Sequence, residues 1–185
     1  MSIFETSLPT AAAADAAGVP HETLRNWIKR YEGSVLVSNK SAPKGGGAHG
    51  RTRTFSIFSI MQFAVAYELI KEGIAPERAL QAGLHFGHFG EDAGGLSRLP
   101  AMVFFEPKDK NLLTTLVLSP KGEAIVGHSV IEDPIAQARI RLGHSLHDKV
   151  VFHVMQIDPV FREVVDRLGY HPAAVLAGRF DSYQQ

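Results

Sequence analysis

Basic side chains are concentrated in one short segment of the chain. Between Pro20 and Phe55 the sequence has seven basic residues against two acidic ones, although the 185-residue chain has 19 of each and a formal net charge of zero. Arginine can donate two N–H groups to a phosphate or a guanine edge, and lysine neutralises phosphate as a mobile charge. The segment therefore predicts a surface that follows the phosphates of a nucleic acid. Its basic residues are Arg25, Lys29, Arg30, Lys40, Lys44, Arg51 and Arg53.

Two short helices are predicted to present part of this segment. Thr10 is expected to cap a first helix that ends at Ala17, with Gly18 in the following turn. Pro20 suits a helix start because its missing N–H costs nothing there, so a second helix is predicted over 20–32. A tight glycine-containing turn between two helices is typical of a helix-turn-helix. The second helix is expected to bury one face and to present cations and an amide on the other, because its apolar residues recur with the helical period at Leu24, Trp27, Ile28 and Tyr31.

A β-hairpin is predicted to follow the second helix. Residues 34–38 (SVLVS) and 51–55 (RTRTF) have the composition of short strands, and residues 39–50 between them are rich in Gly, Pro, Ser and Lys. Such a hairpin would form a basic wing over 34–55. Long helices are then predicted over 56–72, ended by Gly73, and from Pro76 through Leu84 or beyond.

The order of these elements and several local residues resemble the MerR family of winged helix-turn-helix regulators and its excisionase-like relatives. The match runs from Leu8 to Leu84, a little under half the chain. It rests on AADAAGV at 13–19, HETLRNW at 21–27, an Arg-x-aromatic ending of the wing, and a Leu-x-x-x-Gly ending of the next helix. The last two features are Arg53 with Phe55 and Leu69 with Gly73.

The resemblance implies a domain that binds double-stranded DNA as a dimer. The second helix, 20–32, would enter the major groove, and the wing, 34–55, would contact the backbone or the minor groove. By the same resemblance, recognition-helix positions correspond to Thr23, Arg25 and Asn26, and wing positions to Arg51 and Arg53.

Side-chain chemistry divides the basic segment into two roles. Arg25 and Asn26 are the better candidates for reading sequence, because arginine can pair with guanine and asparagine with adenine through two hydrogen bonds. Salt-sensitive backbone binding is expected mainly from Lys29, Arg30, Lys40 and Lys44. His21 and Glu22, at the start of the second helix, are second-rank candidates.

The second half of the chain has a different composition, with ten basic and twelve acidic residues from Gln81 to the end. The glycine-rich stretch 85–95 predicts a boundary between a DNA-binding domain, 1–90, and an oligomerisation or effector-sensing domain, 91–185. The whole chain is expected to be α+β, a winged helix-turn-helix followed by a small α+β domain with an antiparallel sheet. The second domain is predicted to have strands over 101–106, 111–118, 124–131 and 150–157, helices over 133–142 and 158–168, and a weak helix or tail over 172–185.

Several other functions are disfavoured by what the sequence lacks. The absence of cysteine excludes thiolate metal sites and cysteine nucleophiles, so the cysteine-based metal sensing of the MerR family is not expected. We expect no metal, no cofactor and no enzymatic activity. Two histidine pairs and an imagined hydrolase triad are weak signals, because neither a carboxylate-rich ligand set nor a G-x-S-x-G turn accompanies them. These residues are His85 with His88, His144 with His147, and Ser129 or Asp148 beside a histidine.

Partners and location follow from the same observations. No heptad pattern follows Leu84, so we expect a homodimer formed through the C-terminal half rather than through a coiled coil. The sequence predicts neither a membrane span nor a secretory signal, and we expect a cytoplasmic protein. RNA polymerase or another protein is a further candidate partner. Two alternatives stay open: a protein-interaction adaptor built on a helix-turn-helix scaffold, and a basic face that is an ordinary solvated helix surface.

Overall fold

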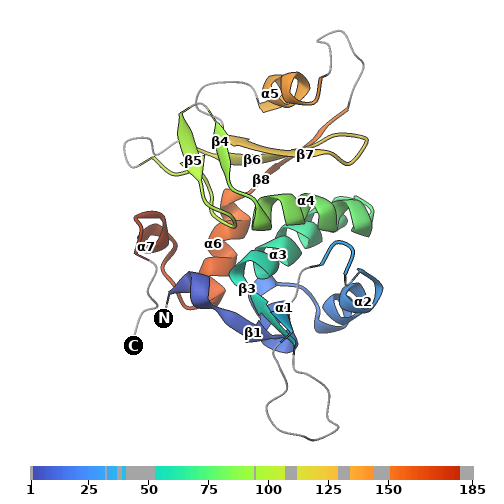
Figure 1. Cartoon of the computed structure of the whole chain (residues 1–185), viewed down its shortest axis with the longest axis vertical. Helices are drawn as coiled ribbons and strands as arrows, with labels where there is room; N and C mark the ends of the chain where they lie inside the picture. Colours follow the sequence, from blue (N-terminus) through green and yellow to red (C-terminus); the bar gives the residue numbers. More distant parts are fainter. Residues whose placement is uncertain are drawn as a thin grey trace, which may run out of the picture.

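The computed structural model describes residues 2–31, 33–36, 39–40, 53–93, 95–106, 112–128, 134–143 and 151–179. It confirms the predicted α+β class, because helices alternate with small antiparallel sheets (Figure 1). A short 3₁₀ turn, Ile3–Glu5, opens the chain. The α-helices are α1 (Thr10–Ala17), α2 (His21–Tyr31), α3 (Ile57–Lys71), α4 (Pro76–His88), α5 (Pro134–Arg141), α6 (Asp158–Arg167) and α7 (Pro172–Leu176).

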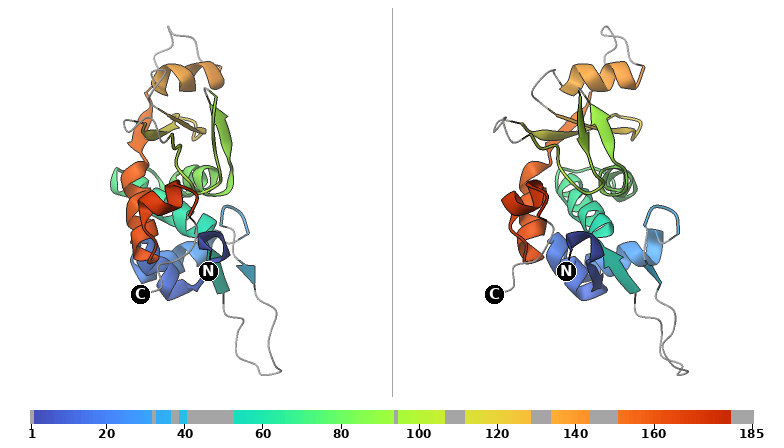
Figure 2. Two further views of the ribbon diagram at one scale, coloured as in Figure 1. Left: turned by 90° about the vertical axis from the view of Figure 1, so that its left-hand side faces the viewer. Right: turned by 60° about the vertical axis from the view of Figure 1, so that its left-hand side comes forward.

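The strands form three separate antiparallel sheets. The first sheet has the order β1-β3-β2, the second pairs β4 with β5, and the third has the order β7-β6-β8. Helices α3 and α4 lie between the first sheet and the third, and α5 lies at the far end of the molecule (Figures 1 and 2). The bounds of the strands are β1 (Ser7–Pro9), β2 (Asn39–Lys40), β3 (Arg53–Ser56), β4 (Glu91–Ala93), β5 (Leu96–Arg98), β6 (Thr114–Leu118), β7 (Ala124–His128) and β8 (His153–Gln156).

The first two helices form where they were predicted. Gly18 ends α1 with φ of +67°, a backbone conformation that favours glycine. Thr10 does not cap this helix, however: Pro9 occupies the N-cap position and provides no side-chain hydrogen bond. Thr10 is the first helical residue instead, and the proline before it has no side-chain acceptor for the N–H groups of the first turn.

The strand predicted over residues 34–38 is wrong at Ser34 and Val35, which lie in a turn, whereas Leu36 forms an isolated bridge. The carbonyl of Tyr31 accepts hydrogen bonds from the N–H groups of Ser34, Val35 and Leu36 at 3.2–3.3 Å, and from the Ser34 hydroxyl at 2.9 Å. This carbonyl at the end of α2 therefore folds residues 33–35 into a turn. The next described strand is β2, which pairs with β3. Residues 32, 37, 38 and 41–52, and with them Lys44 and Arg51, lie outside the described residues.

The sequence did not predict β1, which pairs antiparallel with β3 through Leu8 and Phe55. Three residues around a proline are too few to give a strand pattern. Phe55 is fully buried and its ring meets that of Phe63 edge-on, with centroids 5.2 Å apart. This contact attaches the first sheet to α3.

Helix α3 is buried on nearly all sides and packs along α4. Its buried Gln62 amide donates to the carbonyls of Val35, at 2.8 Å, and Leu80, at 3.1 Å. Opposite it, Gly83 and Gly87 bring the backbone of α4 against α3 so closely that an added Cβ would lie under 3.0 Å from a carbonyl oxygen of α3. The two glycines thus allow the helices to pack closely, and Gly87 does so within the stretch 85–95 that was predicted as a break between domains.

The glycine-rich stretch 85–95, predicted as a break between domains, is largely ordered structure. Helix α4 continues to His88, and the β4–β5 hairpin follows at once. Buried residues from both predicted domains join one hydrophobic cluster that runs from Ile3 to Val175. The division into 1–90 and 91–185 remains a prediction.

The third sheet differs from the predicted meander. Residues 102–106 form no strand: Ala101 has φ of +60°, and the N–H of Phe104 donates to the Thr114 hydroxyl at 2.8 Å, a side chain rather than a strand partner. The third strand is β8, which pairs with β6. Asp158 does not cap α6 but is its first residue, and its carboxylate accepts the N–H of Thr114 at 2.7 Å.

The described helices include none that is long and apolar enough to cross a membrane. The most apolar, α3, has 15 residues, whereas a span needs about 20.

Gly83→Ala tests the close approach of α3 and α4. In an ordinary helix the change stabilises, because alanine is the better helix former. Here the new methyl group would meet the Gln62 carbonyl, so we expect the free energy of unfolding to fall by about 1–3 kcal/mol. Chemical unfolding followed by circular dichroism measures this, with the exposed Gln81→Ala on the same helix as control. An unchanged or higher stability of Gly83→Ala would contradict the packing.

Candidate nucleic-acid interface

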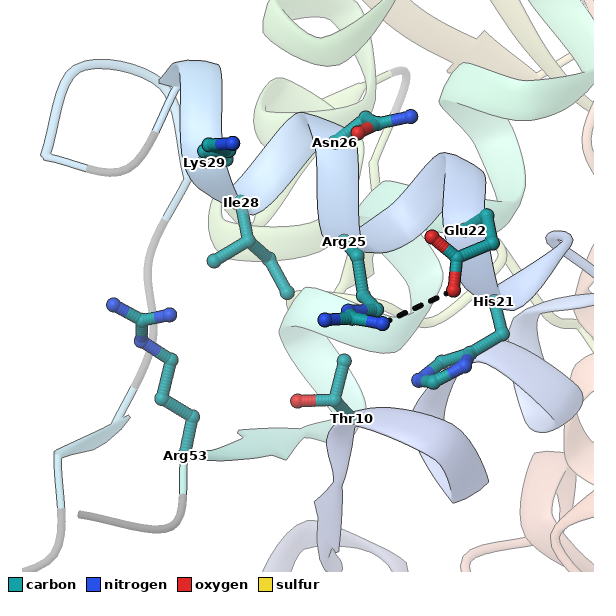
Figure 3. A pocket seen from close by; sticks show the side chains of 8 residues that line it. All are labelled: Thr10, His21, Glu22, Arg25, Asn26, Ile28, Lys29 and Arg53. Carbon is teal, nitrogen blue, oxygen red and sulfur yellow. Dashed lines mark hydrogen bonds and ion pairs between the residues drawn. The ribbon is translucent and has the colours of Figure 1, made fainter. Parts of the chain in front are cut away.

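An open hollow lies between the exposed face of α2, the start of α1 and strand β3 (Figure 3). From α2 it receives Arg25, Asn26 and Lys29, and from β3 it receives Arg53. Four of the nine residues predicted to bind DNA are therefore brought together from two elements. The two of these residues from different elements that are nearest in the sequence, Lys29 and Arg53, are 24 residues apart. Its full lining is Thr10, His21, Glu22, Arg25, Asn26, Ile28, Lys29 and Arg53.

The amphipathic pattern of α2 turns this face outward. Leu24, Trp27 and Ile28 are buried, and the Trp27 ring packs against that of Tyr67 on α3 with centroids 6.3 Å apart. With that side anchored, Arg25 and Lys29 must point to solvent, because residues four apart in a helix lie on one face. The orientation of the polar face is thus set by the aromatic contact on the other side.

Arg25 is held in place by an acidic neighbour. Its guanidinium donates to the Glu22 carboxylate at 3.1 Å, and both side chains are largely exposed (Figure 3). Exposed pairs of this kind contribute little to stability. The pair therefore restricts where Arg25 points without preventing it from exchanging partners.

The other predicted residues lie elsewhere. Thr23 is half-buried and Arg30 is exposed with its guanidinium 5.4 Å from the centre of the Tyr31 ring; neither lines the hollow. Both fall on the flank of α2, about 100° round the helix from Lys29. Lys40 belongs to β2, paired with Arg53.

Sequence reasoning did not assign Thr10 and Ile28 to this surface. Thr10 reaches it because the first turn of α1 lies under α2 (Figure 3), and Ile28 because a mostly buried side chain still forms part of the wall. Nothing in the local sequence marks either residue as part of a binding surface, because the sequence pattern indicates a helix cap at Thr10 and a core residue at Ile28. The second-rank candidates His21 and Glu22 do line the hollow.

A second polar cluster is buried between α4 and the β4–β5 hairpin. Arg98 on β5 donates to the Phe86 carbonyl at 3.1 Å, lies over the Phe86 ring at 4.8 Å, and has Glu91 3.8 Å from its Nε. Burial lowers the pKa of Arg98 to about 10, although Glu91 opposes the shift. Burial also raises the pKa of Glu91. The cluster fastens the hairpin to the end of α4.

The histidines beside this cluster sit in the last turn of α4. His85 Nδ1 lies 3.4 Å from Glu91, and the His88 ring lies 6.2 Å from that of Phe58. Burial lowers the pKa of both, and in His85 the charge of Arg98 adds to the effect. Among the described residues there is no group of three or more side chains suited to a metal ion. His144, His147, Ser129 and Asp148 lie outside the described residues.

No known family model matches this chain, and no curated protein matches it at the significance required.

His88→Gln tests how the burial of the His88 side chain affects stability at different pH values. A histidine whose pKa is lowered by folding supports the fold above its ordinary pKa of 6.5, and the support is lost as the pH falls through the lower folded-state value. Between about pH 7.5 and pH 5.5 we therefore expect the wild-type melting temperature to fall further than that of His88→Gln. The exposed His21→Gln is the matched control and should follow the wild-type curve. Equal losses in wild type and His88→Gln would refute this role.

Proposed function

We propose that this chain is a sequence-specific transcription regulator of the cytoplasm that binds double-stranded DNA. Helix α2 would lie in the major groove, and the β2–β3 segment would follow the backbone or the minor groove, as in a winged helix-turn-helix. One observation carries the proposal: Arg25, Asn26, Lys29 and Arg53 converge on one open hollow from two elements. A basic helix face by itself is a common solvated surface. Here Arg53 of β3 adds a further cation to the hollow beside α2, so the cationic surface is concave and is formed by two elements.

The arrangement supports a division of roles. Asn26 and Arg25 lie on the outward face of α2 and carry the bidentate groups that read base edges. Arg53 stands on a strand beside the helix, where it would meet the phosphates that flank a helix in the groove (Figure 3). Glu22 offsets one positive charge at the rim, so Arg25 would leave Glu22 on binding.

Arg53→Ala tests the backbone contact. We expect weaker binding to all DNA sequences alike, and a slope of log affinity against log salt that is shallower by about 0.9, the value for one lost phosphate contact. Mobility shifts on genomic fragments across a salt series measure both. Arg179→Ala removes an exposed arginine from the C-terminal side of the molecule and should leave both values unchanged. No shift of wild-type protein at low salt would contradict DNA binding and favour the adaptor alternative.

Arg25→Ala tests sequence reading. Loss of a bidentate base contact should cost about 1–3 kcal/mol on the preferred site and relax the preference at one base pair. Selection of bound genomic fragments with wild type and variant measures the preference position by position. Glu22→Gln is the informative companion, because it removes the acidic neighbour and should strengthen binding to all sequences without relaxing preference. If Arg25→Ala weakened every sequence equally, Arg25 would be a phosphate contact.

A further inference from the structure

Exposed apolar side chains are unevenly distributed over this molecule. In the described part of the chain, every exposed large hydrophobic residue lies after residue 88, in the part of the sequence that does not contain α2. Three of them lie on α5 and on the segment that forms β8: Ile140 on α5 is 74% exposed, Val151 just before β8 is 73% exposed, and Val154 on β8 is 44% exposed. Exposed apolar side chains that gather on one face are typical of an interaction surface.

Strand β8 is the edge of the third sheet at this surface. It pairs with β6 on one side, and among the described residues no strand pairs with it on the other. A hollow touches all four residues of β8, and its other walls come from the end of α3, at Glu68 and Leu69, and the start of α6, at Pro159. Because successive side chains of a strand point to opposite faces, a hollow that touches all four reaches the strand along its edge.

The hydrogen-bond pattern identifies which backbone groups are available. Ile157 donates its N–H to the carbonyl of Thr114, the residue directly opposite it on the β6 side. In an antiparallel ladder hydrogen-bonded and non-hydrogen-bonded pairs alternate, so every second residue before Ile157 is hydrogen-bonded to β6. His153 and Met155 therefore direct their N–H and C=O groups to β6. Val154 and Gln156 direct theirs away from it, into the hollow.

We propose that a second copy of this chain occupies the edge, with the two β8 strands antiparallel across a twofold axis. Val154 of each copy would pair with Gln156 of the other, so that all the outward N–H and C=O groups of both residues are used. The two Met155 residues would then lie opposite each other on the axis. The result is one continuous six-stranded antiparallel sheet, formed from two copies of β7-β6-β8.

The composition of β8 suits pairing with a second copy of itself. Strand β8 has no lysine, arginine, aspartate or glutamate, so two copies pair without like charges facing each other. Nor does it have a proline or lysine of the kind that protects exposed edges from pairing. A stable dimer buries about 800 Å² per partner, more than a four-residue strand pair supplies. Val151, two residues before the strand, is exposed and extends the surface. The ring of Phe152 lies 5.7 Å from Arg139 of α5, whose neighbour Ile140 is also exposed.

Sedimentation of the full-length chain without DNA tests the dimer, and its result is independent of DNA binding. We expect a dimer in the micromolar range. Val154→Lys places like charges at the paired edge and should raise the dissociation constant by at least about tenfold. Leu99→Lys makes the same change at an exposed apolar residue outside the hollow and should leave the dimer unchanged. A monomeric wild type, or equal effects of the two lysines, would overturn the proposal.

A single-cysteine variant tests the register. The chain has no cysteine, so Met155→Cys introduces the only thiol. Residues opposite each other in a non-hydrogen-bonded antiparallel pair have Cα atoms about 4.5 Å apart, within the range that a disulfide spans. Mild oxidation should therefore convert Met155→Cys to a covalent dimer, whereas Leu99→Cys should stay largely uncoupled. A wild-type dimer whose Met155→Cys variant fails to cross-link would exclude this strand pairing.

Discussion

Helices α3 and α4 approach each other more closely than side chains normally allow, and the other elements are placed by this pair. Gly83 and Gly87 leave no Cβ between the two backbones, and the Gln62 amide fills the space beside them with hydrogen bonds to Val35 and Leu80. Both acceptors are backbone carbonyls, so the amide nitrogen of this buried side chain is paired in the core. One side chain thus joins the turn after α2 to α4.

Both ends of the molecule are fixed to this helix pair. On one side, Trp27 packs on Tyr67 and Phe55 on Phe63, so α2 and the first sheet are each held by an aromatic contact with α3. On the other, Arg78 of α4 donates to the Ser119 carbonyl at 2.8 Å in the turn between β6 and β7. The proposed DNA surface and the proposed dimer edge are therefore both attached to this helix pair, which would fix the spacing and direction of two copies of α2.

The buried Arg98 cluster connects the same pair to the β4–β5 hairpin at some energetic cost. Removing a guanidinium from water is expensive, and Arg98 Nη2 has no hydrogen-bond partner among the described residues. Contacts with Glu91, the Phe86 carbonyl and the Phe86 ring compensate in part. Such a cluster is better understood as a device that fixes where the hairpin docks than as a source of stability.

The sequence by itself determined the elements whose signals are local. The period of Leu24, Trp27 and Ile28 predicted α2 and its polar face. Gly18 and Gly73 predicted the ends of α1 and α3, because left-handed turns depend on the residue at the turn itself. Tertiary structure alone decided the rest. The Tyr31 carbonyl holds Ser34 and Val35 in a turn, and the Thr114 hydroxyl accepts the N–H of Phe104 where a strand over 101–106 was predicted. Gly87 serves helix packing inside the stretch 85–95 that was predicted as a break. The meeting of Arg53 with Arg25 and Lys29, like the open edge of β8, depends on contacts between residues far apart in the chain, which no local pattern encodes.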